Sequence, residues 1–255
     1  MRSFRHMALP AWLLVLSLSG VASSAHAAAE VHKLQFVLNA IPGSVDGGDF
    51  NRSVDDVNTN LKRVGLQTLD HVSFGWQFGM EMRYFVRPNI ALAAGVSHLR
   101  ARQEREYLPT LTSDVVLSGE VLSVPVHVGA DYYFAPYNQG DFRAQFYAGG
   151  GLLSLTSTRA TLQLQSVGLD ASSGATSFKN VSTGDGTGFY TELGVHMFFA
   201  MRYSVLLGGV YRSAEVKPTA FYGQLGSGPE TYYGTIPRSI SASGFGVKAA
   251  VSIGL

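Results

Sequence analysis

Apolar side chains occupy every second position along much of this chain. The clearest stretch is VSFGWQFGMEMRYFV, in which aromatic and aliphatic residues alternate with small or polar ones. A period of two is typical of a β-strand, because successive side chains point to opposite faces of a sheet. Eight segments are predicted to be strands on this basis: 33–41, 72–86, 89–104, 115–135, 141–165, 186–201, 204–216 and 239–255.

The connections between the predicted strands alternate in length. Those after the second, fourth and sixth strands are short, whereas those after the first, third, fifth and seventh span roughly 30, 10, 20 and 20 residues. In an up-and-down barrel, this places the short turns at one rim and the long loops at the other, as in bacterial outer-membrane barrels. The register of the fifth strand is not fixed by the sequence. The glycines at 149–151 allow the inward face to change from odd-numbered to even-numbered residues or the reverse.

The first long connection contains a predicted helix. Its sequence, DFNRSVDDVNTNLKRVG, opens with Asp49 as a candidate N-cap and closes with Gly65 at a C′ position. Apolar residues recur every three or four positions and form one stripe: Val54, Val57, Leu61 and Val64. This helix either covers the mouth of the barrel or dips into its interior as a plug.

Two arrangements fit the alternation, a soluble barrel with an apolar interior and a membrane barrel with an apolar exterior. The less apolar face of the third strand carries Ala91, Ala93 and Gly95, which are too small and apolar for a wetted surface. They suit the crowded interior of an eight-stranded barrel. The opposite faces carry the bulk that lipid requires. The residues predicted to face lipid are Phe74, Trp76, Phe78, Met80, Met82, Val126, Val128, Leu193, Val195, Met197, Phe199, Phe245, Val247, Val251 and Ile253.

Charged side chains and histidines fall on the face predicted to be interior. Both signs are present, and buried charges are tolerated when they are paired. We therefore predict a salt-bridged interior in which Glu81, Asp131 and Glu192 are the anions. The predicted interior charge network comprises Glu81, Arg83, His127, Asp131, Arg143, Glu192, His196, Arg212 and Lys248.

Composition and the N-terminal segment favour an exported protein. Charged residues make up 15% of the chain, against about 25% in ordinary soluble domains. The formal net charge of +1 gives no indication of nucleic-acid binding, and the absence of Cys excludes disulfides and thiolate metal sites. Residues 1–27 combine Arg2 and Arg5, an apolar run and the small-residue site Ala25-His26-Ala27. We predict a secretory signal peptide there and a single barrel domain over 28–255.

The last predicted strand alternates up to the final residue, Leu255. This resembles the C-terminal signal strand by which the barrel-assembly machinery recognises outer-membrane proteins, although that signal usually ends in Phe or Trp. As a whole, residues 31–255 resemble small outer-membrane barrels of the OmpA, OmpX and OmpW kind. The resemblance implies an all-β, eight-stranded antiparallel up-and-down transmembrane β-barrel, with the short helix in its first extracellular loop. It also implies location in a Gram-negative outer membrane, with contacts to its lipids and lipopolysaccharide.

One pair of residues raises the possibility of catalysis. His71 and Ser73 share a face of the second predicted strand beside Asp70, which resembles the His-x-Ser pair of outer-membrane lipid A deacylases. Phe74 follows where that pattern has Asn, and the pair is predicted to face the interior, whereas lipid A approaches from outside. Neither feature fits the deacylase pattern.

Metal and cofactor sites are not expected. His127 and His196 are predicted to face inward from strands that are not adjacent, as hydrogen-bonded interior histidines. We expect a non-enzymatic outer-membrane barrel with an envelope or surface-ligand-binding role, or one that passes small apolar solutes, as the resemblance to the OmpW kind implies. The alternatives are an outer-membrane lipid-modifying enzyme and a soluble periplasmic lipocalin-like binder. The extracellular ligand is not identified by the sequence.

Overall fold

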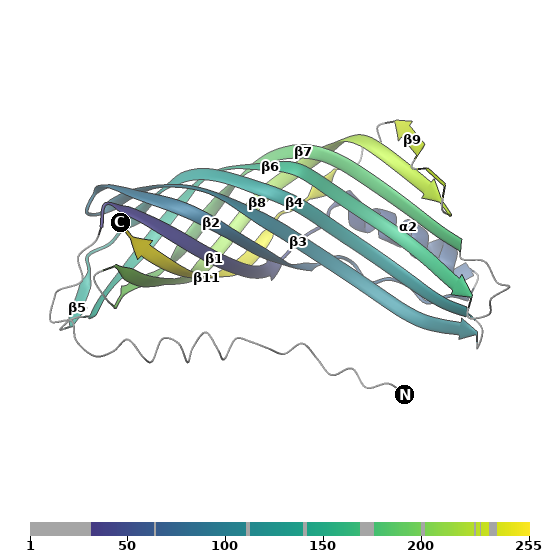
Figure 1. Cartoon of the computed structure of the whole chain (residues 1–255), viewed down its shortest axis with the longest axis horizontal. Coiled ribbons are helices and arrows are strands. Elements are labelled where there is room, and N and C mark those ends of the chain that lie inside the picture. Colours follow the sequence, from purple (N-terminus) through teal and green to yellow (C-terminus); the bar gives the residue numbers. More distant parts are fainter. Residues whose placement is uncertain are drawn as a thin grey trace.

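Eight long antiparallel strands form one closed ring in the computed structural model (Figure 1). The structure describes residues 32–255 except 64, 111–112, 140–141, 169–175, 200–201, 227, 230 and 235–238, so the predicted signal peptide lies outside it. Each strand of the ring pairs with its neighbour in sequence, and the last pairs with the first, which confirms the predicted up-and-down architecture. The ring consists of β1 (Leu34–Ser44), β2 (Phe74–Arg87), β3 (Ile90–Thr110), β4 (Ser113–Tyr133), β6 (Phe142–Gly168), β7 (Thr176–Phe198), β8 (Tyr203–Leu225) and β11 (Gly244–Gly254).

Four short elements decorate this ring. They are α2 (Asp49–Arg63), β5 (Tyr137–Gln139), β9 (Thr231–Gly234) and β10 (Ile240–Ser241). Strand β5 extends the short-turn rim beside β6, and β9 and β10 both pair with β8. Within the described part of the chain, no helix has the length and apolar character needed to cross a membrane.

The strands differ in length, and this divides the barrel into two zones. Strands β3, β4, β6, β7 and β8 have 21 to 27 residues, whereas β1, β2 and β11 have 11 to 14. The five longer strands continue past the shorter ones at one end, around α2 (Figure 1). We call the closed eight-stranded part the lower zone and the five-stranded continuation the upper zone.

Polarity inverts between the two zones. In the lower zone of β4, Val126 and Val128 point outward, and the buried Asp131 points inward. In the upper zone of the same strand, Leu117 is buried inside while Glu120 lies on the outer side. Odd-numbered residues of β4 point inward in both zones, so the backbone alternation does not change. The inversion arises because the residue types at the inward and outward positions change. The upper zone is therefore built like a soluble protein.

Two sequence expectations about the strands are wrong. The connections after the third and fifth predicted strands are shorter than expected, because the strands pair on into the upper zone, where Thr110 lies opposite Ser113. The parity change in β6 occurs at Ser157 and not at the three glycines, because the extra residue of a β-bulge sits there with φ of 52°. The Ser157 amide donates to Asp185 Oδ1 at 2.8 Å, which stabilises the bulge.

Helix α2 fills the mouth of the barrel and packs on the inner face of the upper zone. Its residues Phe50, Val54 and Leu61 are buried in one apolar cluster with Leu117 and Leu155 of the wall. Val57 is partly buried against the same cluster, and Val64 lies outside the described residues. This arrangement fits a cover over the mouth and not a plug deep in the interior.

The ends of α2 and the segment after it are fixed by side-chain hydrogen bonds. Asp49 is the first helical residue, so it does not act as the expected N-cap; its Oδ2 instead accepts from the Ser239 amide at 2.9 Å. Gly65 has φ of +74°, as expected at a C′ position. Asn58 exchanges two hydrogen bonds with the Leu69 backbone, which holds the following loop against the helix.

Truncating the apolar stripe of α2 is expected to loosen the upper zone. Leu61→Ala should cost about 2–5 kcal/mol of local stability, because the small side chain leaves a cavity in the cluster. Hydrogen exchange of the α2 amides should accelerate while that of β2 stays unchanged. Thr59→Ala, at an exposed position of the same helix, is the control. Equal protection of α2 in both variants would contradict this packing.

Candidate functional site

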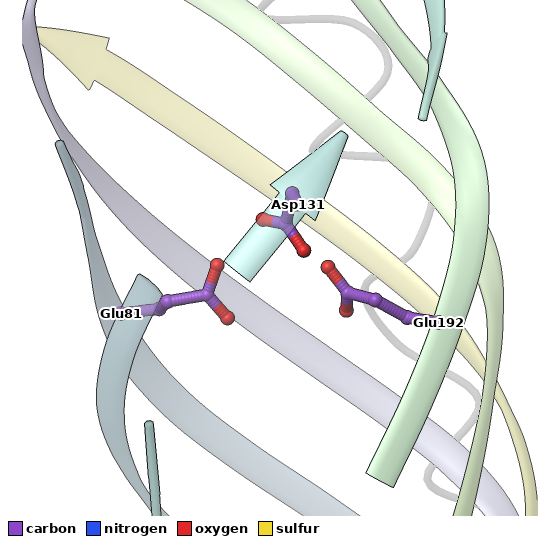
Figure 2. Close-up of side chains that lie close together, drawn as sticks. All are labelled: Glu81, Asp131 and Glu192. Carbon is purple, nitrogen blue, oxygen red and sulfur yellow. The ribbon is translucent and has the colours of Figure 1, made fainter. Parts of the chain in front are cut away.

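Three acidic side chains from three strands converge inside the lower zone (Figure 2). Glu81 lies on β2, Asp131 on β4 and Glu192 on β7, and their carboxylate oxygens lie within 4.8 Å of one another. All three are buried. Three carboxylates cannot share a low-dielectric interior without cations, because an isolated buried charge is very costly.

Two basic side chains, Arg83 and Lys248, offset two of the three carboxylate charges. Arg83 of β2 is fully buried; its Nε donates to Glu81, and its Nη2 donates to Glu192 Oε1 at 2.5 Å. Its Nη1 lies 3.3 Å from Asp131 Oδ2. Lys248 of β11 donates from Nζ to Glu81 Oε2 at 3.0 Å and to Glu192 Oε2 at 2.7 Å. The five side chains form one ionic cluster, which joins strands on opposite sides of the ring.

Aromatic rings surround the guanidinium of Arg83. Its Nη1 also donates to the Tyr133 hydroxyl at 2.7 Å, and its Cζ lies 4.9 Å from the centre of the Tyr147 ring. Neither tyrosine is a member of the predicted charge network. The signal was present for Tyr133, which lies two residues after Asp131 and therefore on the same face of β4.

The two interior histidines have separate partners. His127 Nε2 lies 3.2 Å from Glu81 Oε2, at the edge of the ionic cluster. His196 lies between the Tyr133 hydroxyl, 3.2 Å from Nδ1, and Ser204 Oγ, 2.7 Å from Nε2. A Ser–His pair of this kind can act as nucleophile and base. Both residues are buried in the barrel, however, so a substrate has no approach to Ser204.

Two predicted members of the network lie apart from it. Arg212 is buried in a separate polar layer nearer the upper zone, where it donates to Gln77 Oε1 at 2.8 Å and to the Ser44 carbonyl at 3.0 Å. Arg143 lies close to the short-turn rim, with its Cζ 5.8 Å from the centre of the Phe198 ring. The sequence period gives the direction of a side chain but not its height in the barrel.

Small residues make room for this interior. A Cβ on Gly149 would lie 1.9 Å from Asp131 Oδ1, and one on Gly95 would lie 2.5 Å from the His127 ring. Neither approach is possible without moving the side chain that the new Cβ would meet. The inward face therefore contains many small residues in the sequence, and the larger charged and histidine side chains of neighbouring strands fill the space that these residues leave.

The interior of the lower zone is sealed over the residues described. A cavity of about 30 Å³ separates the ionic cluster from the Arg212 layer, which is room for about one water molecule. Towards the short-turn rim, the ionic cluster is followed by a packed group that includes Phe85, Tyr147 and Leu206. The apolar cluster around α2 closes the opposite end. The described side chains therefore leave no water-filled channel.

The three carboxylates have the ligand atoms of a cation site, but most of these atoms are already engaged. Carboxylate oxygens are the ligands that Mg²⁺ and Ca²⁺ prefer. Here the oxygens of Glu81 and Glu192 already accept from Arg83 and Lys248. The arrangement is that of a structural ion cluster, with the cationic positions filled by the chain itself.

The outer surface of the lower zone is apolar. Aromatic residues lie towards both of its ends. Tyr211 pairs with Phe245 near the upper zone, and the rings of Tyr132 and Phe134 meet edge to face near the short-turn rim. Leu193, between these ends, is 68% exposed. All the residues predicted to face lipid point outward, with Val195, Met197 and Val251 partly covered by neighbours and the remainder exposed: Phe74, Trp76, Phe78, Met80, Met82, Val126, Val128, Leu193, Phe199, Phe245, Val247 and Ile253.

The His71–Ser73 pair does not lie in the interior, contrary to the sequence expectation. Strand β2 begins only at Phe74, and the preceding loop turns Val72 into the apolar cluster. His71 is consequently exposed, with Nε2 2.8 Å from Asp55 Oδ1 of α2. Ser73 lies on the exposed side as well, and its carbonyl accepts from the Val45 amide.

No protein-family model matches the sequence, and no curated protein sequence matches it. Solved structures of similar fold include the outer membrane protein OprG of Pseudomonas aeruginosa, with 13% identity, coverage of 89% of this chain and 98% of that one, and a TM-score of 0.43. Neisserial surface protein A has 15% identity, coverage of 88% and 97%, and a TM-score of 0.37. The N-terminal barrel domain of Pseudomonas aeruginosa OprF has 11% identity, coverage of 88% and 98%, and a TM-score of 0.35. The expected resemblance to small bacterial outer-membrane barrels is thus one of fold alone.

Removing one cation of the ionic cluster is expected to destabilise the barrel strongly. Lys248→Met leaves Glu81 and Glu192 with a deficit of buried positive charge, which should cost about 3–5 kcal/mol in urea unfolding. Adding Glu192→Gln should recover part of the loss, because the uncompensated charge is then smaller. Arg102→Gln breaks the exposed pair with Glu104, and should change stability by about 1 kcal/mol or less. Similar effects of Lys248→Met and Arg102→Gln would argue against a coupled buried cluster.

Proposed function

We propose that this protein is a non-enzymatic, integral β-barrel of the Gram-negative outer membrane. The observation that carries the proposal is the inside-out lower zone, which is apolar outside and ionic inside. Water favours the opposite distribution, since burying charge is costly and exposing a broad apolar band is unfavourable. A surrounding bilayer favours an apolar exterior and a polar interior. In a closed barrel, the backbone N–H and C=O groups of the strands are all paired with neighbouring strands, so none is exposed to lipid.

The height of the apolar surface supports a bilayer as its environment. On β2, the outward residues from Phe74 to Tyr84 are all aromatic or methionine. These ten residue steps extend about 33 Å along the strand, at about 3.3 Å each. A strand tilt of about 40° reduces this to about 25 Å along the barrel axis, which is the height of the apolar band in outer-membrane barrels.

The upper zone is proposed to project from the cell surface into water. Its outer side carries the exposed ion pair Arg102–Glu104, which a hydrocarbon layer would disfavour. By its resemblance to outer-membrane barrels, the end with the longer connections lies outside the cell and both termini lie in the periplasm. Outer-membrane lipids and lipopolysaccharide would then surround the lower zone, after assembly by the barrel-assembly machinery.

A surface-ligand or envelope role is favoured over the alternatives. A soluble lipocalin-like binder needs an apolar interior for its ligand, whereas the interior here is ionic and filled. The same filling argues against a diffusion pore and against passage of apolar solutes through the barrel. A deacylase-like enzyme needs an active histidine and serine facing lipid, and His71 is engaged with Asp55 above the apolar band.

Fractionation with a gel-mobility assay tests the location. The mature protein should remain in carbonate-washed outer membranes and migrate faster in SDS gels before boiling than after, as a folded barrel does. Recovery in the soluble periplasm, with a single mobility, would overturn the proposal. The boiled sample serves as its own unfolded control.

A charged substitution on the apolar band distinguishes between lipid and water as the environment of the outer surface. Leu193 is exposed, so Leu193→Arg would be nearly neutral in a soluble protein. In a bilayer, the substitution should cost about 2–4 kcal/mol near the midplane, measured by urea unfolding from phosphatidylcholine vesicles. Thr161→Arg, on the outer side of β6 in the upper zone, should have little effect. Equal effects of the two substitutions would contradict the membrane placement.

A further inference from the structure

Two hollows on the outer surface of the barrel meet at the upper edge of the apolar band. One is a groove of about 450 Å³ across β4, β6 and β7. The other is a pocket of about 700 Å³ over β7, β8 and the segments next to α2 and β10. Thr187 and Gly188 of β7 line both. The groove and the pocket are therefore continuous, and one molecule can occupy both.

The groove is apolar and lies in the lower zone. Its outward side chains include Val126, Val128 and Leu152, all of which are exposed. Towards the upper zone they give way to the smaller Ser154 and Thr187, which lie opposite each other in the β6–β7 pairing. The surface is recessed at this pair, because neither side chain has the bulk of its neighbours. An acyl chain fits such a groove.

The pocket, in contrast, is lined by hydroxyl and carboxylate groups. Thr187, Ser213, Glu215 and Asp46 are among its lining residues. Asp46 and Glu215 are exposed, and within the described part of the chain neither carboxylate has a hydrogen bond or an ion pair. An ionised carboxylate only accepts hydrogen bonds. The pocket therefore favours a ligand with several donors, such as the hydroxyls of a saccharide.

The charge of the pocket argues against an anionic ligand. The acidic and basic residues that line it are Asp46, Asp49, Arg52 and Glu215. Arg52 pairs with Asp49 at 2.8 Å, so among the lining residues described no basic group remains to balance the other two carboxylates. A phosphate would be repelled by them. An uncharged saccharide supplies hydrogen-bond donors without negative charge.

Aromatic residues mark the level of the pocket relative to the bilayer. Phe189 lines the pocket, and its ring centre lies 6.5 Å from that of Tyr211, which pairs with Phe245. Aromatic residues of membrane proteins lie at the membrane–water interface, where the lipid head groups are. The pocket thus lies at the level of the head groups, and the groove extends from it into the apolar band.

We propose that these two hollows together bind one glycolipid of the outer leaflet, with an acyl chain in the groove and an uncharged saccharide head group in the pocket. Sugar hydroxyls donate to Glu215 and Asp46. The groove orients the chain but adds little selectivity, because lipid surrounds the band in any case. The head group determines which lipid is retained. This proposal deepens the envelope role and rests on it, because it requires a bilayer around the lower zone.

Lipid competition in nanodiscs tests the choice of head group. The mature barrel is folded in phosphatidylcholine nanodiscs with equal small amounts of digalactosyldiacylglycerol, phosphatidylglycerol and diacylglycerol of the same acyl chains. Native mass spectrometry then counts the lipids that stay bound. The digalactosyl lipid should be retained at least about tenfold more often than either competitor, because its hydroxyls form charge-assisted hydrogen bonds. Equal retention of the three, or a preference for phosphatidylglycerol, would overturn the proposal.

A soluble competitor tests whether the groove takes part. Digalactosylglycerol carries the same head group without acyl chains. At the concentration of the glycolipid it should not displace the bound lipid, because it has no chain to hold it at the groove. Displacement by the soluble sugar would show a saccharide pocket alone and reject the joint site.

Two pairs of variants locate the site. Glu215→Ala should abolish the preference for the digalactosyl lipid, whereas Glu106→Ala, at an exposed carboxylate on β3, should preserve it. Thr187→Trp should block the junction of groove and pocket and abolish retention. Leu92→Trp places the same ring at an exposed position of the apolar band on β3 and should have no effect. Equal effects within either pair would reject the site.

The gel assay separates failure of this inference from failure of the proposed function. A protein that inserts into bilayers and shifts on boiling, yet retains the three lipids equally, keeps the membrane role and loses the glycolipid site. A protein that neither inserts nor shifts loses both.

Discussion

The buried guanidinium of Arg83 is the interaction on which the lower zone depends. It contacts carboxylates from three strands of the ring and the hydroxyl of Tyr133. A barrel that places most of its apolar side chains outward has few left for its interior, so polar groups fill much of it. These groups are tolerable when they are paired, because each unpaired charge would carry its desolvation cost. The ionic cluster thus replaces the hydrophobic core of a soluble domain.

The upper zone solves the same packing problem in the opposite way. There the inner face is apolar, but five strands cannot close a ring, so α2 supplies the missing side of the core. Phe50 and Leu61 of the helix meet Leu155 of the wall. The change from one solution to the other occurs along single strands such as β4, without a change of parity. The two cores thus share one sheet, and a pocket lies between the helix and the wall.

The sequence predicted the ring of strands and the direction of the interior side chains, because both follow from a period of two. It did not predict the extent of the strands. Around Arg102 and Leu117, the outward face becomes polar and the inward face becomes apolar. A strand recognised by its outward apolar residues is therefore predicted to end at this level, although its pairing continues. The loop before β2 was misread for a related reason: Val72 continues the alternation in sequence, yet it packs inward from a loop tied to Asn51. A tertiary contact decides its position.

The candidate site was predictable in direction but not in grouping. Parity alone assigns Glu81, Glu192 and Arg212 to the interior, yet only the first two meet. Which inward residues share a level depends on the strand tilt and stagger of the closed barrel, and these are properties of the whole ring. The same stagger brings Lys248 of the last strand beside Glu81 of the second. The Arg83–Glu81 pair lies within β2, but the contacts of Arg83 and Lys248 with Glu192 join strands across the ring. These contacts can form only once the ring has closed, so their electrostatic energy stabilises the closed barrel and not isolated hairpins.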